Sequence, residues 1–341
     1  MEVAIKDLGE IITGNTPSKK EERFWNSDDI CFVKPDGISD DGITLIRDSN
    51  EYLSENARKK ARVVSKDAVF VTCIGSIGKV GIASEGDYAF NQQINVVVPN
   101  EKVLPKYLAY NLLFSKPRLE AIANAPVVPI INKTQFGEFT ISIEESIAKQ
   151  EQIVRTLDKL SGIIYNRKAE QEKLDNLIKA RFVEMFGNVI VNEKGWKTMA
   201  WQDVLSIVNG KNQKAVEDEN GEYLICGSGG AMGRAIDYLT KENSVIVGRK
   251  GNINKPILMR EKYWNVDTAF GLEPNTDYIN VDYLFMFCVL FDFERLNKAV
   301  TIPSLTKADL LKIEMPVPNM EAQEQFAAFV QQVDKSKFVS N

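Results

Sequence analysis

The chain of 341 residues contains no histidine, and this absence excludes several kinds of catalytic and metal site. A Ser-His-Asp triad, a Cys-His dyad, a histidine general base and a His-ligated zinc all need an imidazole. Cysteine is also scarce, because the four thiols, Cys31, Cys73, Cys226 and Cys288, are scattered without any C-x-x-C spacing. This distribution predicts buried apolar side chains in a reducing compartment, with no metal, no cofactor and no disulfide framework.

Long hydrophobic runs are missing as well. The longest one, residues 283–291, is about half of what a membrane span needs, and charged residues follow Met1 where a secretory leader would be apolar. We therefore expect a cytoplasmic protein with no membrane segment. The charge balance is acidic, with 42 Lys and Arg against 47 Asp and Glu. Because phosphate contacts need cations, this balance argues against nucleic acid unless local loops or a more basic partner supply positive charge.

An internal repeat is the most informative feature of the sequence. Five pairs of segments align: residues 5–14 with 201–210, 71–78 with 247–254, 105–108 with 281–284, 128–133 with 302–307, and Gln-Glu-Gln at 150–152 with 323–325. The segment 14–75 differs most, since its counterpart is roughly 20 residues shorter. We interpret the repeat as two domains that share a scaffold and carry different binding loops. A plain duplication whose loops have drifted is the alternative.

Between the copies, the sequence predicts one long helix over residues 147–186. It has no proline and a single glycine, Gly162, and about 40 residues at a rise of about 1.5 Å would span ~60 Å. Ser142 and Glu145 have the spacing of a capping box at its start. Apolar positions step by four and three, as in a coiled-coil seam; they are Ile153, Leu157, Leu160, Ile164, Leu174 and Ile178. An amphipathic helix lying on one domain is the alternative.

A matching but shorter helix is expected after the second copy, over residues 319–341. Asn319 suits its N-cap, and Phe326, Val330 and Val333 repeat the step of four and three. Paired antiparallel, this helix can cover only the half of the long helix nearest the second copy. The four seam positions between 153 and 164 would then lack a partner within the chain, and exposed apolar seams usually meet another protein.

The ordered, duplicated motifs are similar to those of a known family. The stretches that carry this likeness are 141–154 and 315–326, each with its Gln-Glu-Gln, together with 90–93, 200–204 and 302–309. Each stretch is weak alone, but their duplicated order is specific and extends over essentially the whole chain. The sequence resembles the specificity (S) subunits of type I restriction–modification systems.

The resemblance implies an α+β fold. Two similar mixed α/β target recognition domains, residues 1–146 and 187–318, would be joined by the central helix 147–186, which forms an antiparallel coiled coil with the short C-terminal helix 319–341. Each domain would read one half of a split sequence in double-stranded DNA. The chain itself would be non-catalytic, because adenine methylation and cleavage lie in the modification (methylase) and restriction (translocase/nuclease) subunits. In agreement, it has neither a methylase Asn/Asp-Pro-Pro-aromatic motif nor a Walker A motif.

Partners for the uncovered seam at Ile153, Leu157, Leu160 and Ile164 follow from the same resemblance. Methylase helices or a second S chain would fill it, unless the chain is truncated. Two alternative functions stay open. One is a coiled-coil scaffold whose duplicated domains bind only proteins. The other is an enzyme acting on small molecules, which the missing histidines and catalytic motifs disfavour. Neither the target bases, nor the spacer length, nor whether the complex cuts DNA follows from the sequence.

Candidate DNA contacts are the loops rich in amides, hydroxyls and cations. Arg and Lys suit guanine, Asn and Gln suit adenine, and Ser, Thr and Lys also bind phosphates. In the first copy the candidates are Thr16, Ser18, Lys19, Lys20, Lys34, Ser76, Lys79, Gln92 and Gln93. In the second copy they are Lys211, Asn212, Gln213, Lys214, Ser228, Arg249, Lys250, Asn252, Asn254 and Lys255. For any one of them, a solvated surface role is the alternative.

Overall fold

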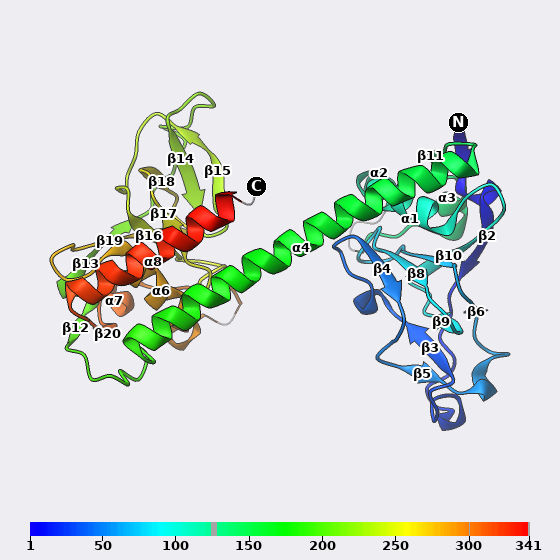
Figure 1. Ribbon diagram of the computed structural model, residues 1–341, viewed down its shortest axis with the longest axis horizontal. Coiled ribbons are helices and arrows are strands. Elements are labelled where there is room, and N and C mark those ends of the chain that lie inside the picture. The colour runs from blue at the N-terminus through cyan, green and yellow to red at the C-terminus, as the bar shows by residue number, and fades with distance from the viewer. Residues whose placement is uncertain (124–127, 300, 340–341) are drawn as a thin grey trace. The chain divides into compact units, whose positions relative to one another are not determined.

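The computed structural model describes residues 1–123, 128–299 and 301–339. The chain divides into two compact units, Met1–Asn166 and Arg167–Asn341, which are called unit 1 and unit 2 below (Figure 1). The division falls inside the long helix α4 (Ile147–Phe186), so each unit includes half of that helix. In the described part of the chain, no helix is both long and apolar enough to cross a membrane.

Unit 1 is built on two sheets. The larger has the strand order β2-β10-β7-β8-β4 and the smaller has the order β5-β3-β9-β6, while β1 pairs separately with β11. The strands are β1 (Glu2–Ala4), β2 (Gly9–Thr13), β3 (Ile30–Val33), β4 (Ile43–Ile46), β5 (Tyr52–Leu53), β6 (Val63–Val64), β7 (Val69–Thr72), β8 (Val80–Ala83), β9 (Tyr88–Phe90), β10 (Ile94–Pro99) and β11 (Thr140–Ser142). The α-helices that precede α4 are α1 (Pro105–Phe114), α2 (Lys116–Ile122) and α3 (Lys133–Glu138).

Both faces of the larger sheet in unit 1 are covered. Strand β7 reads Val-Phe-Val-Thr, and all four of its side chains are buried. Helix α1 packs on one face through Leu108 and Leu112. On the other face, the ring of Phe70 meets the ring of Phe90 from the smaller sheet, with 5.3 Å between ring centroids. Continuous apolar strands are what a sheet between two layers requires.

Unit 2 repeats this plan with fewer strands. Its larger sheet has the order β13-β19-β16-β17 and its smaller sheet has the order β15-β14-β18, while β12 pairs with β20. The strands are β12 (Thr198–Ala200), β13 (Leu205–Asn209), β14 (Tyr223–Gly227), β15 (Gly230–Ala235), β16 (Ser244–Gly248), β17 (Ile257–Met259), β18 (Tyr263–Asn265), β19 (Ala269–Pro274) and β20 (Glu314–Pro316). The α-helices that follow α4 are α5 (Trp201–Val204), α6 (Val281–Leu290), α7 (Lys307–Leu310) and α8 (Met320–Val339).

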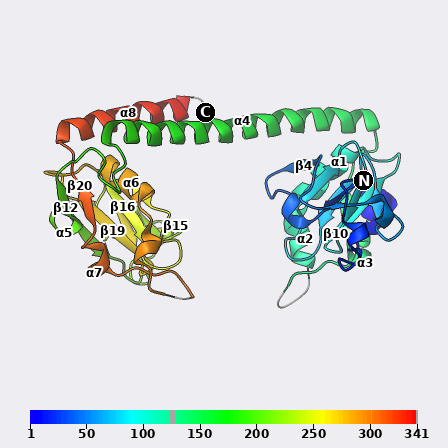
Figure 2. The same ribbon diagram turned by 90° about the horizontal axis from the view of Figure 1, so that it is seen from below.

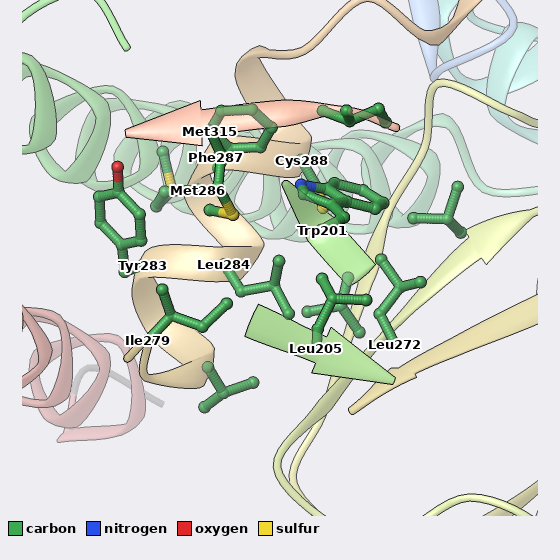
Figure 3. Close-up of a cluster of buried hydrophobic side chains, with 14 of the residues drawn as sticks. Trp201, Leu205, Leu272, Ile279, Tyr283, Leu284, Met286, Phe287, Cys288 and Met315 are labelled. Atoms are coloured by element: carbon green, nitrogen blue, oxygen red, sulfur yellow. The ribbon is translucent and has the colours of Figure 1, made fainter. Parts of the chain in front are cut away.

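The core of unit 2 forms around α6, which is apolar on nearly every side. Trp201 from α5, Tyr283 and Phe287 from α6, and Met315 from β20 gather in one buried cluster (Figure 3). The two units therefore share a scaffold: the sheet order β2-β10-β7-β8 matches β13-β19-β16-β17, and α1 matches α6. The predicted duplication of an α/β domain is confirmed. The elements unique to one unit, such as β4, come from the segment whose length differs between the copies.

The predicted long helix is present with the predicted bounds, Ile147–Phe186, but the predicted capping box is wrong. Ser142 is the last residue of β11 and lies opposite Glu2 of β1, because pairing between segments far apart in sequence takes precedence over a local cap. Ser146 is the residue before the helix, and its Oγ accepts a hydrogen bond from the backbone N–H of Lys149 at 3.4 Å. At the start of α8, the predicted cap is confirmed: Asn319 Oδ1 accepts from Ala322 N at 2.9 Å.

A buried glutamine fixes the start of each long helix, and this explains the repeated Gln-Glu-Gln. In unit 1, Gln150 accepts from Leu104 N at 2.9 Å and donates to the carbonyls of Lys102 and Glu144 at 2.9 and 2.7 Å. In unit 2, Gln323 makes the equivalent bonds to Asn280 N, Tyr278 O and Pro318 O. Both side chains are fully buried. The first Gln of the motif is therefore structural.

Replacing Gln150 by alanine is expected to lower the free energy of unfolding of unit 1 by about 2–3 kcal/mol, because it leaves buried backbone groups without partners. Gln152, the exposed second glutamine of the same motif, provides the control, and Gln152→Ala should change stability by less than about 0.5 kcal/mol. Urea denaturation of the two variants gives the comparison. Equal effects would contradict a structural role for Gln150.

The C-terminal half of α4 packs against α8 within unit 2. The two helices run antiparallel (Figure 1, Figure 2), and the seam residues Ile178, Phe326, Val330 and Val333 are buried in one cluster, with Leu174 packed against it. The predicted antiparallel pairing is thus confirmed. The seam then continues through Phe182 and Phe186, which the heptad pattern did not include. A straight helix that lies on a globular core has a period of about 3.6 residues, so its buried face departs from a strict heptad.

The N-terminal half of α4 presents an apolar strip to solvent. Ile153, Leu160 and Ile164 are 38%, 50% and 59% exposed, and Leu157 is half-buried. Ile163 and Tyr165 are exposed beside them. This agrees with the expectation that these seam positions have no covering helix in the described part of the chain.

Candidate nucleic-acid interface

The candidate loops of unit 1 meet at one edge of its larger sheet, called here the loop edge of unit 1. Strands β2 and β7 end there and β10 and β8 begin there, because neighbouring strands are antiparallel. Backbone hydrogen bonds join the loops: Gly14 N to Ile94 O at 3.1 Å, Asn91 N to Val33 O at 3.2 Å, and Cys73 N to Gln93 O at 2.8 Å. Residues 14–20, 34, 73–79 and 91–93 therefore lie together.

A glycine is required where the first loop of each unit leaves the sheet. A Cβ on Gly14 would lie 2.2 Å from the carbonyl oxygen of Asn91, and a Cβ on the equivalent Gly210 would lie 1.8 Å from that of Val266. Only a residue without a side chain allows the backbones to approach this closely. The two units thus hold their loop edges together in the same way.

Two of the neutral candidates in unit 1 contact each other. Thr16 Oγ1 donates to Gln92 Oε1 at 3.0 Å, and both side chains are exposed. Gln93 Oε1 accepts from Asn91 Nδ2 at 2.8 Å and is half-buried, so it supports the loop. Ser18 is exposed, and its backbone carbonyl accepts from Trp25 Nε1 at 3.2 Å. Ser76 is exposed on the turn between β7 and β8.

Acidic side chains bind most of the candidate cations of unit 1. Glu51 lies between Lys19, at 3.0 Å, and Lys34. Asp40 lies between Lys79 and Lys116, at 3.3 and 3.1 Å. Hydrogen bonds from Lys34 and then Lys19 lower the pKa of the Glu51 carboxyl. Hydrogen bonds from Lys116 and then Lys79 likewise lower the pKa of the Asp40 carboxyl.

The candidate loops of unit 2 meet at the equivalent edge, called here the loop edge of unit 2. Lys211 N donates to Asn265 O at 3.0 Å, Arg249 N to Thr268 O at 2.8 Å, and Gly251 N to Pro303 O at 3.0 Å. The turn 227–230 lies against the segment 248–252, since a Cβ on Gly229 would be 3.8 Å from Asn252 Nδ2. Every predicted contact residue of unit 2 is therefore on one edge or in a loop attached to it.

The candidate cations at the loop edge of unit 2 differ from those of unit 1 in their ion pairing. Within the described ranges, no acidic side chain forms an ion pair with any of the five candidates, Lys211, Lys214, Arg249, Lys250 and Lys255. The guanidinium of Arg249 lies 5.9 Å from the centroid of the Phe270 ring, a cation–π contact that leaves its charge available. These five cations are therefore not held in ion pairs, although Asp267 and residues 217–219 place acidic side chains in the same loops.

Three polar candidates of unit 2 take part in the loop structure itself. Asn254 Nδ2 donates to Asp292 Oδ1 at 3.1 Å, and its Oδ1 accepts from Phe293 N at 2.7 Å. Asn212 Oδ1 accepts from Lys214 N at 2.9 Å, and the carbonyl of Gln213 accepts from Val216 N at 2.9 Å. Ser228 is half-buried and Asn252 is exposed, so Asn252 is an amide of this set that faces solvent, whereas the amides of Asn254 and Asn212 take part in the loop bonds.

Comparison with known proteins agrees with this duplicated arrangement. The sequence pattern of a family described as type I restriction modification DNA specificity domain matches residues 1–176 and 193–339. The chain belongs to this family. It is 25% identical over 372 residues to the type I restriction enzyme MjaIX specificity subunit of Methanocaldococcus jannaschii, with 96% of this chain and 85% of that protein covered.

Other members of the specificity-domain family match parts of the chain or its fold. The EcoR124I/EcoR124II specificity subunit of Escherichia coli is 30% identical over 174 residues, which are 48% of this chain and 42% of that protein. The crystal structure of a type I restriction–modification S subunit from M. genitalium superposes with a TM-score of 0.60. It shares 16% identity, with 100% of this chain and 90% of that chain covered, and so shows the same fold.

Sequence reasoning missed the acidic side chains at the loop edge of unit 1. Glu51 and Asp40 lie in loops far along the chain from the lysines that they bind, and no spacing in the sequence connects them. Lys116, at the start of α2, was missed for the same reason. The prediction of buried cysteines is confirmed for Cys73, Cys226 and Cys288 but is wrong for Cys31, which is only half-buried. Burial raises the pKa of the Cys73 thiol to about 12 and that of Cys226 to about 11.

Proposed function

We propose that this chain is the DNA-reading, non-catalytic specificity subunit of a type I restriction–modification complex. Residues 1–146 and 187–318 act as target recognition domains, each reading one half of a split DNA sequence. Helices 147–186 and 319–341 hold the domains. One observation carries the proposal. The chain belongs to a family of DNA specificity domains and contains the same scaffold twice, and the equivalent edges of the two copies bear different loops.

The side chains at the two loop edges supply the chemistry that such reading needs. Exposed Thr16 and Gln92 in unit 1, and Arg249, Lys250 and Asn252 in unit 2, are the base-edge candidates. Lysines such as Lys211 and Lys214 bind phosphates and set the position of the duplex. The remaining predicted contacts support these loops or add charge.

We propose methylase and restriction subunits as protein partners, with the chemistry of adenine methylation and DNA cleavage located in them. The relatives of this chain are named as specificity subunits of type I restriction enzymes. The exposed strip of Ile153, Leu160 and Ile164 is a candidate surface for a partner helix, either of a methylase or of a second S chain. DNA as a target is consistent with a cytoplasmic location.

Mapping methylated adenines genome-wide in cells that carry this chain with a cognate methylase tests the proposal. The expected result is a single motif of two short sequences separated by a spacer of constant length. The motif should disappear when the gene for this chain is deleted. A continuous motif, or methylation that persists without the chain, would contradict the proposed function.

A further inference from the structure

The two loop edges carry similar numbers of candidate cations but differ in the acids around them. In unit 1, three of the four candidate lysines, Lys19, Lys34 and Lys79, are bound by Glu51 or Asp40. Asp40 also binds Lys116, a fourth ammonium group at this edge. In unit 2, the five candidate cations have no acidic partner among the described residues.

Each acid in unit 1 is shared by two lysines that come from different elements. Glu51, just before β5, faces Lys19 from the loop after β2 and Lys34 from the end of β3. Asp40, in the loop before β4, faces Lys79 at the start of β8 and Lys116 of α2. A carboxylate between two ammonium groups cancels one positive charge and holds both groups in place. A DNA phosphate must then compete with it for the same donors.

We propose that Glu51 and Asp40 restrain the sequence-independent attraction of unit 1 for DNA. Unit 1 then depends on neutral side chains such as Thr16 and Gln92 for its DNA contacts, while unit 2 supplies most of the phosphate attraction. The inference rests on the proposed function, because it concerns the same loop edges. It assigns to two acidic residues a role in specificity, since phosphate contacts carry no sequence information.

The ion pairs can be broken with little effect on the fold. The side chain of Asp40 is 63% exposed and that of Glu51 is 28% exposed, so both carboxylates reach solvent, and ion pairs at such positions contribute little to stability. Glu51→Gln and Asp40→Asn keep the shape of each side chain and remove its charge. The lysines that they release remain at the loop edge.

The test measures binding of the full chain to a duplex of random sequence at several salt concentrations. Each lysine that gains a phosphate contact adds about 0.9 to the slope of log affinity against log salt, or about 3.5-fold over a fourfold change in salt. For the double variant Asp40→Asn/Glu51→Gln we expect at least two such contacts. Its affinity should therefore respond about 12-fold more strongly to that change than the affinity of the parent chain.

A matched control removes two negative charges from the opposite edge of the same sheet. Glu85, after the end of β8, and Glu101, after the end of β10, are both exposed, so Glu85→Gln/Glu101→Gln changes the net charge equally. Equal salt slopes for the two double variants, or no change in either, would overturn the inference and leave the proposed function standing. A folded parent chain that binds no DNA even with the cognate methylase present would overturn both.

Discussion

Replacing Arg249 and Lys250 together by alanine is expected to abolish recognition of one half of the DNA target and to leave the other half unaffected. Both side chains lie at the loop edge of unit 2, where no ion pair among the described residues neutralises them. A cation that pairs with a base contributes about 1–3 kcal/mol, so the double variant should lose about 2–6 kcal/mol on the half-site that unit 2 reads.

The loop itself should survive this change. Arg249 N donates to Thr268 O, and Arg249 O accepts from Leu305 N, and these backbone bonds do not depend on the side chain. Methylation assays on duplexes altered in either half give the measurement. In a variant that has lost one half-site, sequence changes in that half no longer matter, while changes in the other half still do.

A control for this prediction removes the same charge elsewhere in unit 2. Lys197 and Lys241 are exposed; Lys197 precedes β12, and Lys241 precedes β16 at the end of the sheet away from the loop edge. Lys197→Ala/Lys241→Ala should leave recognition of both halves intact. A uniform loss of affinity for every sequence in the Arg249/Lys250 variant would reduce both residues to phosphate contacts.

Phe182→Ala is expected to lower the free energy of unfolding of unit 2 by about 3–5 kcal/mol. The ring is fully buried and joins three helices, with centroid distances of 4.9 Å to Phe186, 5.4 Å to Tyr283 and 5.2 Å to Phe326. Its removal leaves a cavity between α4, α6 and α8. Because α8 is held by few other aromatic contacts of this kind, it should also become more accessible to protease.

Denaturant unfolding of the full chain, followed by limited proteolysis at the end of α8, measures both effects. The neighbouring residue offers the control: Val183 is 44% exposed, and Val183→Ala should change stability by less than about 0.5 kcal/mol. Stability that responds equally to the two substitutions would show that α4 and α8 are not held through this aromatic cluster.

Much of the fold could be predicted because it depends on the spacing of residues that are close together in the sequence. The absence of proline and the regular apolar steps defined α4 to the residue, and the aligned segments predicted two copies of one scaffold. The seam at Ile178, Phe326, Val330 and Val333 was predicted by spacing. The error at Ser142 has a non-local cause, since its pairing partner Glu2 is at the other end of unit 1.

The candidate interface was predictable as a set of loops but not as a charge distribution. Glycine, amide and cation content marked the loops, and antiparallel pairing of the strands brought them to one edge in each unit. The partners of individual side chains could not be predicted. Asn254 illustrates this, because its amide is bound to Asp292 and Phe293, residues far along the chain.

The sequence by itself determined the duplication, the two helices and the family, because each depends on the order and spacing of residues along the chain. Only the tertiary structure decided that Gln150 and Gln323 are buried structural residues, and that Glu51 and Asp40 bind lysines at the loop edge of unit 1, whereas the candidate cations of unit 2 form no ion pair among the described residues. The physical reason is that burial and ion pairing depend on which distant segments meet, and these contacts are fixed by how the strands pair.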